Sequence, residues 1–494
     1  MKKIILIFLL MCVSSACDNG FEELNVDPTK PTQINVGNKL SATQLFTSGG
    51  RFETWRANLI YQAAMMQHLS TTAGFWAGDK YTWNKGYASS LFDRYYPSAV
   101  KSIEDILFQL DEEGAPDEMK AIARIMRVFI YSRLTDLYGD IPYSEAGQAV
   151  ISGILKPKYD KQSEIYPDLL KELEESANAL GSGISEFGDA DLIYKGDQAK
   201  WKRLANSLML RLGFRLIKVD PDASKEWVTK AIAGGVMQSN ADIFYIEHTV
   251  GPEGINRNGN GEVFTVDDSP SFSETFINFL QDDPRLPILA ERRSDGSNNP
   301  DDLIGLPNGL DSQLLLDQLS KENTDTFARP NRSTITGEDA PMFFQTYAEV
   351  EFLLAEANVR WGLAGNAEDH YNNGVRAAMK MLELYGPNAA ISDAQVDAYL
   401  QLKPYDPSNA LEQINTQYWA ATFFNDYETF ANWRRTGYPT LNPVNFPGNV
   451  TNGTIPRRMS YSENEQTDNA ENYQAAVSNQ GPDELSTRVW WDVP

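Results

Sequence analysis

The segment from Ala355 to Gly374 reads AEANVRWGLAGNAEDHYNNG, and it decides how the chain is expected to fold. Apolar residues recur with helical spacing before and after a short turn. The turn contains Gly362 and Gly365, and glycine is the residue that most readily ends one helix and reverses the chain. The segment therefore predicts two helices joined by a tight connection.

Small residues mark where these two helices approach each other. Ala367 follows Ala355 by twelve residues, Tyr371 comes four residues later, and Gly374 three residues after that. Small side chains allow two backbones to come close, and one aromatic ring then fills the remaining gap. This is the spacing of a tetratricopeptide repeat, a helix pair that stacks on neighbouring pairs to bury a continuous core.

The same helical periodicity continues outward along the chain, while strand signals are few and short. We expect residues 39–494 to form a single, predominantly α domain: a tetratricopeptide-like helix-pair superhelix with long loops and a few short strands, such as one at 262–266. Helices are predicted at residues 40–69 (as one long helix or two), 93–110, 117–138, 163–180, 201–219, 224–233, 342–361, 366–385 and 411–435.

Composition excludes several classes of protein. The 494 residues contain 43 Lys and Arg against 68 Asp and Glu, a formal net charge of −25. Such acidity disfavours nucleic acids and anionic membrane surfaces as partners. Two cysteines and three histidines cannot build a disulfide scaffold or a cluster-type metal centre. The composition favours a binding protein over metal or thiol chemistry.

The N-terminus is typical of an exported lipoprotein. Lys2 and Lys3 precede an apolar run at residues 4–13 that is too short to span a bilayer, and small residues lead to Cys17. We predict a signal peptide at 1–16, lipidation of Cys17, and a tether at 17–38. Cleavage would lower the formal charge from −25 to −27. The alternative is ordinary secretory cleavage near Ala16 without a lipid.

A loop rich in aromatic residues is the strongest candidate for a ligand site. Between residues 71 and 90 the chain holds Phe75, Trp76, Tyr81 and Trp83 among several glycines. Sugar rings stack their C–H faces on such side chains, and peptides also bind to aromatic platforms. The competing interpretation is that these rings only pin the loop to the core.

Catalytic and metal-binding motifs are not found. The chain has no zinc-protease, nucleophile-elbow, dinucleotide-binding or P-loop signature, and His68, His248 and His370 lie far apart. We therefore predict no catalytic residue, no metal and no cofactor. One open alternative is a structural Ca²⁺, because oxygen donors cluster in one loop as Asp295, Asn298, Asn299, Asp301 and Asp302, although their spacing is not an EF-hand.

Eight segments, distributed in order over the predicted mature chain, together resemble the SusD/RagB family of outer-membrane nutrient-binding lipoproteins, in particular its SusD-like second subgroup. They are NVDPTKPT at 25–32, YSRLTDLYGDIPY at 131–143, GDQAKWKRLANSLMLR at 196–211, DPRL at 283–286, TYAEVEFLLAEA at 346–357, ETFANWRRTGYP at 428–439, IPRRMSY at 455–461 and VWWD at 489–492. Most of these segments suggest structural roles. We expect Arg434 and Arg435 to pair with acids or carbonyls, and Trp490 and Trp491 to dock the C-terminus.

The resemblance implies both a scaffold and a role. It implies four tetratricopeptide-like helix pairs, a lipid anchor in the outer membrane, and a position on the cell surface of a Gram-negative bacterium. It implies a SusC-like TonB-dependent β-barrel as partner, to which the lipoprotein delivers captured oligosaccharides or, in some members, peptides. No catalysis is implied. Arg329 is a further candidate to bind a sugar or a carboxylate.

Two other functions stay open at this stage. A surface-anchored glycoside hydrolase would need two carboxylates placed across a bond, and the many acidic doublets of the chain do not reveal such a pair. A free periplasmic solute-binding protein would lack the lipid on Cys17, and its usual alternation of strands and helices is not seen here.

Overall fold

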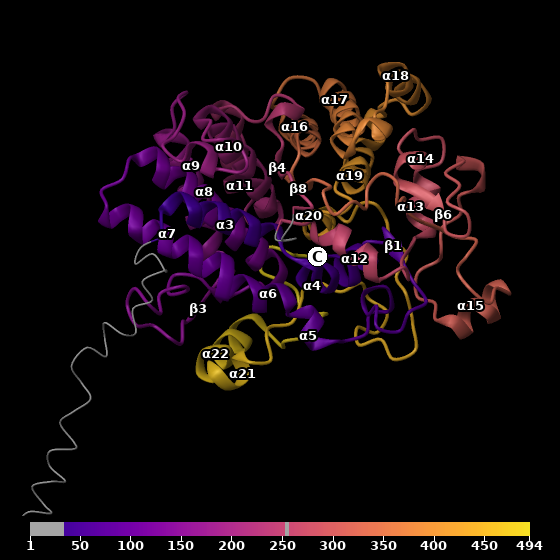
Figure 1. Ribbon diagram of the computed structural model, residues 1–494, viewed down its shortest axis with the longest axis horizontal. Coiled ribbons are helices and arrows are strands. Elements are labelled where there is room, and N and C mark those ends of the chain that lie inside the picture. The colour runs from indigo at the N-terminus through magenta and orange to yellow at the C-terminus, as the bar shows by residue number, and fades with distance from the viewer. Residues whose placement is uncertain (1–33, 252–255) are drawn as a thin grey trace, which may run out of the picture.

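The computed structural model describes residues 34–251 and 256–494, and its chain is predominantly helical (Figure 1), as predicted. The predicted signal peptide, Cys17 and most of the tether lie outside the described residues. The principal helices are α3 (Val36–Ser48), α7 (Lys101–Glu112), α8 (Asp117–Tyr138), α9 (Gln162–Ala179), α10 (Gln198–Arg215), α11 (Pro221–Gly234), α16 (Tyr347–Trp361), α17 (Ala367–Lys380), α19 (Ala410–Ala421) and α20 (Asp426–Thr436).

The pair α16–α17 has the predicted tetratricopeptide-like form. Gly362 ends α16 with a φ of 68°, in the left-handed region that favours glycine. A Cβ atom at Gly374 would lie 2.5 Å from the ring of Phe352, so only glycine fits there. The ring of Tyr371 lies beside Phe352 and fills the space between the helices. The small residues thus set the distance between the two helices.

Shorter helical elements join these pairs. Residues Arg51–Glu53 (α4) continue directly into a π-helix, η1 (Thr54–Ala63). The region 40–69 is therefore divided near Gly49, which is the two-helix form of the prediction. The other short α-helices are α5 (Lys85–Ala88), α6 (Ser90–Tyr95), α12 (Gly259–Val266), α13 (Glu274–Phe279), α14 (Leu286–Leu289), α15 (Ser312–Leu319), α18 (Asp393–Leu402), α21 (Glu465–Asp468) and α22 (Ala470–Gln480).

Strands are short and pair antiparallel in twos among the described residues. The pairs are β1 (Leu69–Ser70) with β5 (Ser271–Phe272), β2 (Ile141–Pro142) with β3 (Tyr159–Asp160), β4 (Phe244–Ile246) with β8 (Met342–Gln345), and β6 (Ala290–Arg292) with β7 (Ala328–Pro330). In the pairs β1–β5 and β4–β8 the partners lie far apart in the sequence, so these pairs tie loops to distant parts of the chain.

One predicted element is wrong in type, and one predicted helix begins later than expected. Residues 262–266 belong to helix α12, because the Asn258 side chain accepts from the Gly261 N–H and caps the helix start. Residues 342–345 form strand β8, and the helix begins only after Thr346. There the Thr346 hydroxyl accepts from the Glu349 N–H while the Glu349 carboxylate accepts from the Thr346 N–H.

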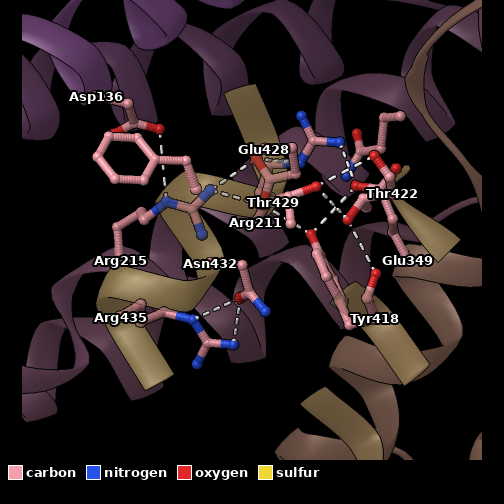
Figure 2. A network of polar contacts seen from close by, with 12 residues as sticks. Asp136, Arg211, Arg215, Glu349, Tyr418, Thr422, Glu428, Thr429, Asn432 and Arg435 are labelled. Carbon is pink, nitrogen blue, oxygen red and sulfur yellow. Dashed lines mark hydrogen bonds and ion pairs between the residues drawn. The ribbon is translucent and has the colours of Figure 1, made fainter. Parts of the chain in front are cut away.

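A buried network of charged side chains connects the helix pairs (Figure 2). Arg211 of α10 lies 2.6 Å from Glu349 of α16. Arg215, one turn later, donates to both oxygens of Glu428 on α20 at 2.6 and 2.7 Å. The Tyr418 hydroxyl contacts Glu349 at 3.1 Å and Glu428 at 2.8 Å, which joins the two ion pairs into one network.

Arg434 and Arg435 extend this network as predicted, since they pair with carbonyls and an acid. Arg435 donates to both oxygens of Glu356 at 2.7 Å, a bidentate pair. Arg434 donates to the carbonyls of Asp136 and Arg457 at 2.6 and 2.9 Å. Although burial alone would raise the pKa of Glu356, its pairs with Arg435 and Arg360 lower it to about 2.

The C-terminus docks on the same network. Trp491 is buried, and its Nε1 donates to Asp136 at 3.0 Å. The guanidinium of Arg434 lies over the Trp491 ring, 4.6 Å from its centre. Asp136 belongs to α8, so the end of the chain closes against one of its first long helices. Trp490 is only partly buried.

Replacing Arg435 with alanine should destabilise the protein strongly, because the buried carboxylate of Glu356 would lose its bidentate partner and keep only the single pair with Arg360. We expect a loss of about 3–5 kcal/mol in the free energy of unfolding, measured by urea titration. Arg376→Ala is the matched control: Arg376 pairs with Asp397 at the surface, and its loss should cost about 0–1 kcal/mol. Equal destabilisation by both variants would contradict the structural role of the buried network.

Candidate functional site

The aromatic loop at 71–90 runs from β1 to α5 and is fixed to the body of the protein. Trp76 is 0% exposed, and its Nε1 donates to Asp267 at 2.9 Å. Tyr81 is also buried, with a left-handed φ of 52°, and its hydroxyl accepts from the Val444 N–H. These two rings have no free surface for a ligand. Their burial favours the competing interpretation, in which these two rings pin the loop to the core.

Close backbone packing and a buried ion pair hold the loop in place. A Cβ atom at Gly78 would lie 2.2 Å from the carbonyl oxygen of Ile60, so the loop contacts η1 directly. Lys80 lies 2.7 Å from Asp79 and also donates to the carbonyl of Thr71 at 2.7 Å. Burial raises the pKa of Asp79 despite the neighbouring Lys80. The loop is a rigid support.

Phe75 stands out from this support. It is 43% exposed, although its neighbour Trp76 is fully buried. Its ring meets that of the half-buried Trp55 edge to face, with centres 6.0 Å apart. The Nε1 of Trp55 donates at 3.0 Å to the same Asp267 oxygen that accepts from Trp76. One buried carboxylate therefore orients both tryptophans beneath Phe75.

Further aromatic residues extend the surface along α4, η1 and α5. Phe52 is exposed, and Arg56 lies over both its ring and that of Tyr87, at 5.0 and 5.2 Å. We call the four rings of Phe52, Trp55, Phe75 and Tyr87 the aromatic face. Phe52 and Trp55 were not predicted as site residues, although their spacing of three residues in a predicted helix places them on one side.

Three arginines converge on one acid next to the aromatic face. Asp268 accepts from Arg329 at 3.0 and 3.1 Å and from Arg332 at 2.5 Å, and Arg293 lies 3.2 Å away. Partial burial works in the opposite direction, but the hydrogen bond from Arg332 and the charges of the other two arginines lower the pKa of Asp268. Arg329 also donates to Glu291 at 2.9 Å.

Consecutive acids thus join the two parts of the site. Asp267 binds the tryptophans and Asp268 binds the arginines, so Phe75 and Arg329, predicted separately from the sequence, flank the same dipeptide. Aromatic rings can stack on sugar C–H groups, while the arginines and Asp268 can hydrogen-bond to hydroxyl or amide groups at the edge of a ligand. Loop residues Asp268, Arg293 and Arg332 carry no periodicity that would have revealed them in the sequence.

Trp83 does not join this cluster. Its Nε1 donates to the Ser460 hydroxyl at 3.1 Å, and Lys85 lies over its ring at 5.0 Å. The ring is half-buried against the C-terminal segment. A role of Trp83 in ligand binding stays a prediction, and nothing in its contacts links it to the aromatic face.

The proposed calcium ligands are engaged by an arginine. Arg292 lies 2.5 Å from Asp295 and 3.8 Å from Asp302, and its hydrogen bond is the main reason why the pKa of Asp295 is lowered to about 2. Across residues 34–251 and 256–494, no group of three or more His, Cys, Asp or Glu is arranged to hold a metal. The structural Ca²⁺ stays a prediction.

The histidines have structural partners. His68 lies 2.5 Å from Asp426, His248 lies 2.7 Å from the Ser48 hydroxyl, and His370 lies 2.6 Å from Glu351. The three histidines therefore contact three different sets of residues.

A family model described as SusD-like, starch-binding and associating with the outer membrane matches residues 28–462 of the chain. The chain belongs to this SusD-like family. Proteins of the family bind nutrients such as glycans and are associated with the outer membrane. Among residues 34–251 and 256–494 of this SusD-like protein, no helix has the length and apolar character required to cross a membrane.

Solved structures agree with the family assignment. A chitin-binding protein shares 35% identity at a TM-score of 0.84, covering 93% of this chain and 100% of its own. A SusD-like protein described as Bacteroidetes AC2a shares 28% identity at a TM-score of 0.81, covering 93% of this chain and 100% of its own. A chitin-binding SusD homologue from Flavobacterium johnsoniae shares 24% identity at a TM-score of 0.78, covering 93% of this chain and 99% of its own. At this identity the likeness supports the fold alone. No curated protein matches the chain.

Replacing Trp76 with alanine should act on stability, because it empties a fully buried site and leaves Asp267 without one of its two indole donors. We expect the free energy of unfolding to fall by about 3–5 kcal/mol, measured by urea titration. The neighbouring substitution Phe75→Ala is the control and should cost less than about 1 kcal/mol, since that ring is largely exposed. An unchanged unfolding curve for Trp76→Ala would contradict its pinning role.

Proposed function

We propose that the mature protein is a cell-surface lipoprotein that binds oligosaccharides on the aromatic face and delivers them to a SusC-like TonB-dependent transporter. The observation that carries the proposal is an exposed aromatic face, set on a rigid loop and bordered by the Asp268–arginine cluster, on a SusD-like scaffold. Large exposed apolar groups with polar neighbours are the usual mark of a recognition surface.

The ligand that fits best is a neutral glycan of the chitin type. The relative that shares 35% identity over nearly the whole chain is described as a chitin-binding protein. An N-acetylated sugar offers C–H faces and a methyl group to Phe75 and Trp55, and an amide group that can pair with Asp268 or Arg332. The charge of −27 for the processed chain disfavours acidic glycans.

The proposed mechanism is capture and transfer without bond cleavage. The acids at the aromatic face are already committed, since Asp267 accepts from two indoles and Asp268 binds three arginines. Neither is free to act as a general acid or nucleophile, which argues against the glycoside hydrolase alternative at this face. Release to the transporter would then follow from a differential affinity between the free and docked states.

Replacing Phe75 with alanine should weaken the binding of a chito-oligosaccharide about tenfold or more, because one stacking surface is lost, while the melting temperature changes little. Isothermal titration calorimetry with purified mature protein measures this effect. Phe108→Ala is the matched control, since Phe108 on α7 is 44% exposed but lies outside the aromatic face. Unchanged affinity in Phe75→Ala would disprove the ligand-binding role of the face, and tighter binding of peptides would favour the peptide alternative.

Replacing Cys17 with serine should release the protein from membranes, because the proposed acyl chains could no longer be attached. Fractionation of cells that express the full precursor without a barrel partner measures the effect, and the wild-type precursor is the control. Membrane association of the serine variant at the wild-type level would contradict the lipoprotein assignment.

A further inference from the structure

An apolar groove of about 550 Å³ lies on the side of the protein where the described chain begins. One wall is formed by α6 and η3 (Tyr96–Val100), and the other by the loop at 144–158, which we call the apolar arm. The side chains that line it include Tyr96, Pro97, Val150, Ile151, Ile154 and Leu155. Neither the aromatic face nor the Asp268–arginine cluster contributes to this groove.

The apolar arm exposes side chains that a monomer would normally bury. Val150 is 83% exposed and Leu155 is 79% exposed, the highest values among large apolar residues in the described part of the chain. Single exposed apolar residues are ordinary on protein surfaces, but here two strongly exposed apolar side chains and the half-buried Ile151 and Ile154 lie within six residues beside a groove. This clustering indicates a contact surface.

The arm is held in this position by contacts at its base. The Ser144 N–H and hydroxyl both donate to Asp160, at 2.7 and 2.8 Å. The Lys158 N–H donates to Glu145 at 2.9 Å, and the Asn472 amide donates to the carbonyl of Lys156 at 3.1 Å. A loop tied at both ends presents its apolar residues as a preformed surface, which lowers the entropic cost of binding.

A second groove continues this surface toward the predicted tether. It has a volume of about 470 Å³, shares Pro97, Lys101 and Asp105 with the first groove, and includes Ile34, the first described residue. Only 16 residues lie between Cys17 and Ile34, a span of at most about 60 Å when extended. The apolar arm therefore lies beside the point at which the proposed membrane anchor joins the fold.

The shape and charge of this surface favour a protein over a lipid bilayer as its occupant. The surface is concave, whereas a membrane is contacted by protruding apolar groups with a basic rim. Its rim carries both signs: Asp105 pairs with Lys39 at 2.6 Å, and Glu465 accepts from the Tyr159 hydroxyl at 2.9 Å. Lys101 is exposed and forms no ion pair with another described residue.

Resting on the proposed function, we infer that the apolar arm and its groove form the docking surface for the SusC-like barrel. An extracellular segment of the barrel would place apolar side chains between Tyr96 and Leu155 and an acidic group near Lys101. This arrangement separates the two tasks of the molecule: the aromatic face binds the ligand, and the apolar arm holds the transporter.

The test is the double variant Val150→Asp with Leu155→Asp in the full-length lipoprotein, co-expressed with the SusC-like transporter of its own organism. We expect at least a tenfold loss of co-purified transporter, because two charges would be buried in an apolar interface, with unchanged binding of chito-oligosaccharide. Leu402→Asp is the control: Leu402 is 57% exposed on α18, which lies at the opposite end of the molecule from β3 (Figure 1).

Each other outcome has a distinct meaning. Equal co-purification of wild type and double variant would overturn the docking surface and leave the proposed function intact. If the wild type also fails to retain the transporter, the partner named in the proposed function is wrong and the docking surface falls with it. If the wild type forms a dimer on size exclusion and the double variant does not, the surface belongs to a second copy of the chain. If protein lacking Cys17 binds lipid vesicles and the double variant of it does not, the surface belongs to lipid. Either result would overturn the inference.

Discussion

Pairing of buried arginines with buried acids is the constraint on which the rest of the structure depends. An ion removed from water costs several kcal/mol unless a partner of opposite charge compensates it. Arg211 and Arg215 on α10 satisfy Glu349 on α16 and Glu428 on α20, and Tyr418 on α19 bridges the two acids. Apolar contacts alone would tolerate sliding between helices, whereas these pairs permit one register. The helix scaffold is thereby fixed before any loop is considered.

A fixed scaffold allows the loops to serve function. The aromatic loop is bound on its inner side by Trp76, Tyr81 and the Asp79–Lys80 pair, and Phe75 is the large apolar side chain of the loop that remains exposed. Strand pair β1–β5 places this loop next to the Asp267–Asp268 dipeptide, although the two segments are almost two hundred residues apart in the sequence. Recognition groups from distant loops thus meet on one rigid surface.

Local patterns in the sequence predicted the helices well, since α8 has the predicted bounds and the small residues of α16–α17 act as expected. The segments used to recognise the family supply much of the buried network, so their signal is one of packing and charge pairing. The sequence was less informative about the site. Trp76 and Phe75 are neighbours of the same chemical type, and only the fold determines which is buried. Asp268 and Arg332 lie in loops, and contacts between loop residues leave no periodic pattern in the sequence from which they could be predicted.

The alternation at the tip of the aromatic loop has an evolutionary consequence. Residue 76 holds the loop by filling the core and residue 75 faces outward, so a change at 75 can alter what is bound without unfolding the support. Proteins that share this scaffold can therefore acquire a different ligand specificity through single substitutions at this exposed position. The same property makes position 75 a natural starting point for engineering binders of other glycans.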